Sequence, residues 1–446
     1  MIIMSLDRDA QFGEIIMHRG VEYVMADAVG MMINEAAPFA IASFKQMSEE
    51  YYKYNGEDLN GKRLVVWRTG GFGDLLFVSS LIHHLKRKYP AAKINVATSK
   101  RFHDVWEGNP DISGLSSPGV LPIPLKFLLG HDYQLKFEGT IENDTDPNQL
   151  PAVERFAQEA GVELASPELL PYYPGAFSSF NTARNKLRKH GLELKPMEYG
   201  CIQFKSSSIV RDWRYTRMIE LADRLAEKYD MPILVMGNDF YHDQIMEAGG
   251  KYREMKGEPI HPKALDITPN NLRFLYSSAL IARAKFVVTV DSALVHVAAA
   301  TNTPAVSLYG PFPGQIRTKY YPRNITLEKP GSCLTFPNGC LQHTQAGDRN
   351  VLPVQTHCKE NIDHCRMMDA ISVDEVINAV QEAVDRWGHE TWEDRYKLFK
   401  ERAAYVPEGS TLMVDERAKE VSQPSRHKKS DKQGGNRNRS SKKKRR

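Results

Sequence analysis

The sequence contains two series of short β-rich runs, and helical spacing of apolar residues follows most of these runs. Strands that alternate with helices predict parallel sheets with right-handed crossovers. We therefore expect an α/β protein with two doubly wound domains, residues 61–175 and 176–392, that face each other across one cleft. The expected strands are residues 63–68, 93–98 and 133–137 in the first series, and 199–204, 232–236, 286–290 and 305–309 in the second. The expected helices are residues 75–89 and 149–160, then 215–228, 271–284, 293–300 and 372–387.

The segments outside these series have weaker patterns. Residues 1–60 contain only short apolar runs, so we expect an N-terminal extension that packs on the first domain and has a helix at residues 42–54. Residues 162–180 are rich in Pro, Gly, Ser and aromatic residues, which is typical of an interdomain linker. Residues 393–446 form a C-terminal segment. Its end, residues 424–446, has almost no apolar residues and is predicted to be disordered.

The positive charge of the chain is concentrated at this end. Residues 426–446 hold eleven Lys and Arg and one Asp, a net +10, which leaves −6 for the remainder of a chain whose total is +4. Such a tail is compatible with plain solvation, with contact to an anionic membrane surface or with contact to nucleic acid. We find no spanning apolar stretch and no secretory pattern. The sequence thus predicts a cytoplasmic protein, and tail contact with lipid would make it peripheral at the inner face of the membrane.

A glycine-rich turn, TGGFGD at residues 69–74, lies between the first expected strand and its helix. Gly71 and Gly73 permit a tight turn and close approach of a ligand, and the helix N-terminus adds unpaired N–H groups. Leu76 stands where a dinucleotide fingerprint would need its third glycine. Taken alone, the motif is better explained by a strand–helix turn with Asp74 as N-cap or first-turn carboxylate.

Two further motifs follow strands of the second series. VDSALVHVAAA at residues 290–300 would place Asp291 and Ser292 at a helix start and His296 one turn later, and GPFPG at residues 310–314 ends the next strand. Ligands of open α/β sheets bind at such strand ends. The structural alternative is a helix cap followed by an ordinary helix histidine.

The third motif of the second series, KSSSIVRDW, spans residues 205–213. Its small hydroxyls, together with Lys205 and Arg211, suit phosphate oxygens. By itself it is an ordinary polar loop.

Together these segments resemble the bacterial heptosyltransferases, the ADP-heptose:lipopolysaccharide transferases of glycosyltransferase family 9. The resemblance runs from about Arg63 to Val384, and its most specific block is VTVDSALVHVAAATNTPAVSLYGPFPG. It implies the GT-B architecture, in which two Rossmann-like domains face a central cleft. It also implies inverting transfer from a nucleotide-sugar donor to a saccharide or glycolipid acceptor, such as a lipopolysaccharide core, with no catalytic metal or other required cofactor.

The resemblance also implies roles for individual residues. Asp74 would be the catalytic base that takes the proton of the acceptor hydroxyl, with Gly71 and Gly73 on the acceptor side. Arg211 would stabilise the leaving diphosphate, and Asp291 would bind the hydroxyls of the donor sugar. The implied donor site comprises Lys205, Ser206, Ser207, Asp291, Ser292, Ala293, His296 and Gly310. Ala293 stands where many relatives have glycine.

A cysteine cluster lies downstream of these motifs and comprises Cys333, Cys340, Cys358 and Cys365. Four thiolates could hold a structural zinc ion, but the spacing lacks the CxxC pair of common zinc sites, so plain thiols remain the alternative.

Two other functions stay open at this stage. One is an enzyme of the same fold that acts on nucleic acid or on the nucleotide sugar itself. The other is a non-catalytic nucleotide-sugar-binding module.

Overall fold

The computed structural model divides the chain into two compact units, residues 1–410 and 411–446. The second unit, which includes the basic tail, lies outside the described residues. The structure describes residues 2–12, 15–25, 27–46, 53–117, 123–141, 150–189, 191–206, 211–237, 261–270, 272–334, 365–408 and 410.

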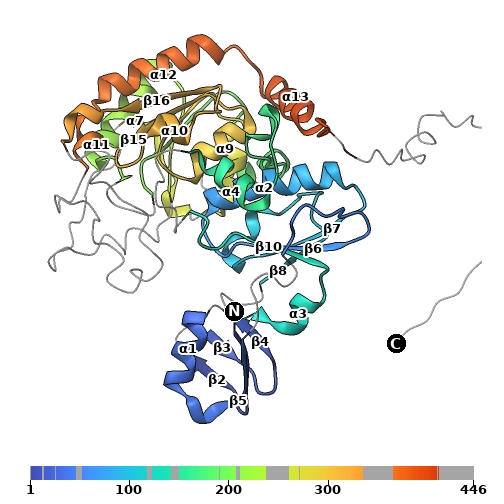
Figure 1. Ribbon diagram of the computed structural model, residues 1–446. Helices are drawn as coiled ribbons and strands as arrows, with labels where there is room; N and C mark the ends of the chain where they lie inside the picture. Colours follow the sequence, from blue (N-terminus) through green and yellow to red (C-terminus); the bar gives the residue numbers. More distant parts are fainter. Residues whose placement is uncertain are drawn as a thin grey trace, which may run out of the picture. The chain divides into compact units, whose positions relative to one another are not determined.

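The first series of expected strands forms a four-stranded parallel sheet in the order β10-β6-β7-β8 (Figure 1). Its strands are β6 (Arg63–Trp67), β7 (Lys93–Ala97), β8 (Gly114–Ser116) and β10 (Tyr133–Lys136), and its main helices are α2 (Phe72–Lys88) and α4 (Ala152–Ala160). The three expected strands are confirmed, whereas the short strand β8 was not expected. Helix α4 ends where predicted, because Gly161 adopts a left-handed conformation (φ 63°) that closes the helix.

The second series forms a six-stranded parallel sheet in the order β13-β12-β11-β14-β15-β16. Its strands are β11 (Gly200–Gln203), β12 (Ile233–Met236), β13 (Ala264–Asp266), β14 (Val287–Val290), β15 (Ala305–Tyr309) and β16 (Asn324–Glu328). Its helices are α7 (Tyr215–Tyr229), α8 (Phe274–Ile281), α9 (Ala293–Thr301), α10 (Gly314–Arg317), α11 (Arg366–Ala370) and α12 (Val373–Trp387). The four expected strands are confirmed within two residues at each end. The two edge strands β13 and β16 were missed.

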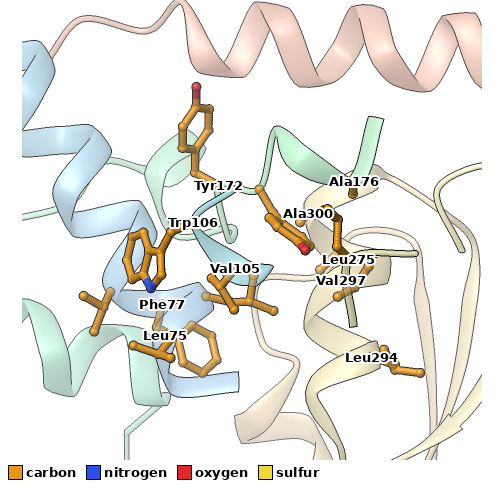
Figure 2. Close-up of a cluster of buried hydrophobic side chains, with 14 of the residues drawn as sticks. Leu75, Phe77, Val105, Trp106, Tyr172, Ala176, Leu275, Leu294, Val297 and Ala300 are labelled. Atoms are coloured by element: carbon orange, nitrogen blue, oxygen red, sulfur yellow. The ribbon is translucent and has the colours of Figure 1, made fainter. Parts of the chain in front are cut away.

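Side chains on the two faces of this second sheet belong to different cores. Ile202 and Val288 pack with α7 and α12, while Cys201 and Val287, one residue earlier on the same strands, pack with α8 and α9. Successive residues of a strand point to opposite faces, so one sheet serves both cores. The core that contains α8 and α9 also includes α2 of the first domain. The two domains therefore share apolar packing, which Figure 2 shows around Phe77 and Val297.

The N-terminal region corrects one expectation. Residues 42–54 were expected to form a helix, but strand β5 (Ile41–Gln46) covers their first part, and residues 47–52 lie outside the described part. Exposure alternates residue by residue from Ile41 to Phe44, so a period of two prevailed over helical spacing. The region forms its own antiparallel sheet, in the order β5-β1-β4-β9, with a small core of Met, Leu, Tyr and Ile side chains. Its other elements are β1 (Ile2–Leu6), β2 (Ala10–Phe12), β3 (Ile15–Met17), β4 (Tyr23–Met25), α1 (Asp27–Ala36) and β9 (Ile123–Pro124).

The segment expected to be a linker is a packed connection. Residues 162–180 hold the short helix α5 (Gly175–Ser178), and α6 (Phe180–Arg188) follows. Tyr173 and Ala176 are fully buried in the core that the two domains share. The segment was expected to be an interdomain linker because Pro and Gly are frequent here, and its aromatic side chains also supply core volume.

The last described helix, α13 (Trp392–Ala403), contacts both domains. Its fully buried Arg395 donates to the carbonyl of Ala284 in the second domain at 2.7 Å. At its other end the carbonyl of Ala403 lies 3.1 Å from Nε2 of His83 on α2. None of the helices in the described part of the chain is both long and apolar enough to cross a membrane.

Candidate active site at the junction of the two domains

The glycine-rich turn joins β6 to α2 and places Asp74 in the first turn of the helix. Gly71 has a φ of 76°, a conformation that favours glycine, and a Cβ atom there would collide with the carboxylate of Asp74. A Cβ atom on Gly73 would lie 3.0 Å from Cδ2 of His296, which belongs to α9 of the second domain. The backbone conformation of Gly71 thus favours glycine, Gly73 leaves little room for a side chain, and the turn that carries Asp74 lies against α9.

Arg68 is a residue of this turn that the sequence analysis missed. Its guanidinium donates to Oδ2 of Asp74 at 2.5 Å and to the carbonyl of Phe137 at 2.9 Å. Arg68 is 2% exposed, whereas the side chain of Asp74 is 26% exposed. The buried cation thus holds the carboxylate in one orientation while solvent and ligands can still reach it.

On the second domain, Asp291 follows β14 and pairs with Arg211, whose Nη1 lies 3.3 Å from Oδ2 of Asp291. Burial alone would raise the pKa of Asp291, but the positive charges of Arg211 and Arg317 hold the pKa below its ordinary value. Asp291 is therefore an ionised carboxylate inside the protein. Arg317, at the end of α10, was not singled out from the sequence, although it lies three residues after the GPFPG motif.

The loop between β11 and α7 carries Lys205, Ser206 and Arg211, while Ser207 lies outside the described residues. Lys205 and Ser206 are buried. The backbone N–H of Ser206 donates to Oδ1 of Asp212 at 2.5 Å. Burial raises the pKa of Asp212 to about 7, against the attraction of neighbouring cations. Asp212, which was also missed, fixes the two ends of this loop to each other.

Ser292 caps the start of α9. Its hydroxyl oxygen accepts from the N–H of Leu294 at 3.3 Å and its hydroxyl donates to Oε1 of Gln203 at 2.8 Å. This is the helix-cap arrangement that the sequence left open as the structural alternative. Ala293 is the first helical residue and is partly exposed, so the N-terminus of α9 is accessible beside Asp291.

His296 contacts the first domain. Its Nδ1 lies 2.6 Å from the hydroxyl of Tyr321, and its ring centroid lies 4.6 Å from that of Phe77 on α2. Burial lowers the pKa of His296 to about 4, so the imidazole is neutral at physiological pH. It can therefore offer hydrogen bonds and packing to this site but not a positive charge.

The neutral state of His296 predicts a pH effect on stability. The unfolded chain, with an ordinary pKa of 6.5, binds more protons than the folded chain between pH 6.5 and about 4. The free energy of unfolding should therefore fall as the pH falls through this window, by up to about 3 kcal/mol from this residue. Urea unfolding of the wild type and of His296→Gln from pH 7 to 4 measures how much of the pH dependence of the free energy of unfolding comes from His296. The contribution of Asp212 is the same in both proteins and cancels. Equal pH slopes for the two proteins would contradict this assignment.

Gly310 directly follows β15 and lies close to Cys365. A Cβ atom on Gly310 would lie 2.6 Å from Cγ of Met368 and 3.0 Å from Sγ of Cys365, so a glycine here permits close packing of α11. Cys333 and Cys365 are buried in the same core, while Cys340 and Cys358 lie outside the described residues. Among the described residues no three metal-ligating side chains come together. The zinc prediction needs all four cysteines and stays a prediction.

These observations place two sets of side chains at one junction. Gly73, which directly precedes Asp74, touches His296, and the helix of His296 begins two residues after Asp291. Phe72 and Phe274 stack across the same junction with ring centroids 4.0 Å apart. A carboxylate from the first domain and an arginine–carboxylate pair from the second therefore lie on elements in direct contact. The chemical roles of these side chains stay predictions.

The fold indicates the class of protein. Two parallel-sheet domains joined through a C-terminal helix form the GT-B architecture of glycosyltransferases. The structure of a glycosyl transferase family 9 protein from Veillonella parvula DSM 2008 is similar, with 16% identity, a TM-score of 0.52, and coverage of 74% of this chain and 99% of that one. E. coli ADP-heptose lps heptosyltransferase II has 15% identity, a TM-score of 0.51 and coverage of 73% and 99%. The iron-containing dodecameric glycosyltransferase TibC from enterotoxigenic E. coli H10407 has 13% identity, a TM-score of 0.50 and coverage of 78% and 80%.

The sequence profile of glycosyltransferase family 9 (heptosyltransferase) matches residues 131–333. This range contains the Arg211 loop and the Asp291 loop. A search of curated protein sequences finds no significant match. Residues 131–333 therefore match glycosyltransferase family 9, and the protein is a glycosyltransferase.

Proposed function

We propose that this enzyme transfers a heptose or a related sugar from a nucleotide-sugar donor such as ADP-heptose to a saccharide acceptor such as a lipopolysaccharide core, with inversion and without a catalytic metal. The observation that carries the proposal is the ionised Asp291–Arg211 pair at the end of β14, beside the turn that presents Asp74. Two of the similar structures bear titles that name ADP-heptose: the E. coli heptosyltransferase II and a TibC complex with ADP-D-beta-D-heptose.

The proposed reaction is a single displacement. Asp74 accepts the proton of the acceptor hydroxyl, whose oxygen forms a bond to the anomeric carbon of the donor sugar. The bond between that carbon and the phosphate oxygen breaks, and the diphosphate leaves with the electron pair. Arg211 and the N-terminus of α9 offset the negative charge that develops on the diphosphate, which is work that a metal ion performs in other enzymes. Attack opposite the leaving group inverts the anomeric centre.

A panel of nucleotide sugars tests the donor class. We expect the ADP-sugar to raise the Tm most among ADP-, UDP-, GDP- and dTDP-linked sugars, because a ligand at 100 times its Kd stabilises a protein by about 2.7 kcal/mol. The free sugar and adenosine serve as controls and should raise the Tm little. A larger Tm shift with a UDP-, GDP- or dTDP-linked sugar would indicate that the donor carries that base instead of adenine. The absence of product with all four donors would contradict the proposal. A Tm shift without product would favour the non-catalytic nucleotide-sugar-binding module, and the absence of both would contradict that module as well.

A further inference from the structure

The Asp291 site contains a second arginine that the reaction outlined above does not use. The charge of Arg317 acts on the carboxylate of Asp291 together with that of Arg211, and it also acts on His296 and Tyr309. His296 is neutral and adds no positive charge, so Arg211 and Arg317 are the main cations that act on Asp291. A site with this composition favours an anionic ligand.

The guanidinium of Arg317 is held in place by its own loop. Its Cζ atom lies 4.6 Å from the ring centroid of Phe312, which is 3% exposed, so the cation rests on a fixed aromatic face. The loop itself is short and contains two prolines, and the hydroxyl of Thr318, the next residue, donates to the carbonyl of Gly314 at 2.8 Å. An arginine ordered before binding loses little conformational entropy when it contacts a ligand.

Tyr309, the last residue of β15, gives an independent sign of a ligand. Its side chain is 0% exposed, and its hydroxyl has no hydrogen-bond partner among the described residues. The groups whose charges act on this hydroxyl include Asp291, Arg317 and Arg211. Burial raises the pKa of Tyr309 well above its ordinary value, so the hydroxyl keeps its proton and can donate it. A buried donor without an acceptor costs free energy, and a phosphate oxygen would satisfy it.

We propose that Arg317 and Tyr309 bind the diphosphate of the donor together with Arg211, and that Arg317 makes the site selective for nucleoside diphosphates over nucleoside monophosphates. This inference rests on the proposed function, because it assigns the diphosphate of a sugar donor to this site. A single guanidinium suits one phosphate group, whereas two guanidiniums that both act on Asp291 suit the two phosphates of a diphosphate.

The test compares ligands that differ in phosphate number. Binding of ADP, AMP and inorganic pyrophosphate to the wild type and to Arg317→Gln is measured by titration calorimetry at fixed ionic strength. We expect Arg317→Gln to weaken ADP and pyrophosphate by about tenfold and AMP by less than about twofold, since charge-assisted hydrogen bonds contribute more than neutral ones. Arg317→Lys should recover part of the loss because it keeps the charge but not the bidentate geometry. Tyr309→Phe should weaken ADP by a few fold, as loss of one neutral hydrogen bond would.

The controls separate this inference from the proposed function. Arg224→Gln, on the exposed side of α7, removes one positive charge far from the described site residues and should leave all three affinities unchanged. Equal losses for ADP and AMP in Arg317→Gln, or no loss for either, would overturn the inference even if the wild type transfers sugar. A wild type that binds ADP selectively over AMP through Arg317 but transfers no sugar would overturn the proposed function and leave the inference standing. If the wild type binds none of the three ligands, both fail.

Discussion

Replacing Asp74 with Asn should lower kcat by about 10²–10⁴-fold, the range in which loss of a general base falls. Asparagine has nearly the same shape as aspartate and its amide oxygen can still accept from Arg68, but it cannot take a proton from the acceptor. The turn and the donor site should remain intact, so donor affinity should stay within about twofold. Release of nucleoside diphosphate in the presence of donor and acceptor gives kcat, and calorimetric titration of the donor gives the affinity.

The matched control for this variant is Glu227→Gln, which removes an exposed carboxylate from α7 in the second domain. It should leave both kcat and donor affinity unchanged. If Asp74→Asn retained most of the wild-type kcat, another group would have to be the base.

Replacing Arg211 with Gln should lower kcat by about 10²–10³-fold, because removal of one group that stabilises transition-state charge has this effect in other enzymes. The effect on kcat should exceed the effect on KM, since negative charge on the diphosphate grows as the bond to the sugar breaks. Initial rates over a range of donor concentrations separate the two constants. The kcat of Arg211→Lys should lie between those of the wild type and Arg211→Gln.

Arg211 also pairs with Asp291, so its loss leaves a buried carboxylate with less compensation. The double variant Arg211→Gln with Asp291→Asn removes both charges and controls for this effect on folding, which its Tm reports. A rise in KM with an unchanged kcat in Arg211→Gln would contradict a role in stabilising the leaving group.

The strands of the two domains could be predicted because parallel strands covered on both faces consist of continuous apolar runs, as in residues 286–290. Helix α12 could be predicted for a second reason, since Ser372 and Glu375 form a capping box at its start. Edge strands β13 and β16 carry mixed side chains because only part of each is covered, so their pattern resembles a loop. The strand β5 was mistaken for a helix because a six-residue run is too short to distinguish the two periods reliably.

The candidate site likewise contains residues that could be named from the sequence and residues that only the fold brings to the site. Asp74, Arg211 and Asp291 lie in motifs at strand ends that resemble those of a known family, and this resemblance allowed them to be named from the sequence. Arg68 and Arg317 act through contacts that only the fold creates. Arg68 meets Asp74 across a glycine turn, and Arg317 is 26 positions after Asp291 in the sequence. Nothing in the local sequence around either arginine distinguishes it from a surface arginine.

The shared core explains why residues 162–180 are packed although their composition is typical of a linker. A linker between independent domains has few contacts, whereas Tyr173 and Ala176 are fully buried in the core that the two domains share. Composition reports which residues favour turns, but it does not report whether a neighbouring domain is close enough to bury the aromatic residues between them.

A crystal structure of the Asp74→Asn variant with an intact ADP-linked heptose tests the central claim most directly, because the variant should bind the donor without consuming it. We predict that the diphosphate lies at the N-terminus of α9 between Arg211 and Arg317, and that the anomeric carbon faces residue 74. Donor bound away from the Asp291 loop, or bound there with its anomeric carbon turned from residue 74, would contradict the account.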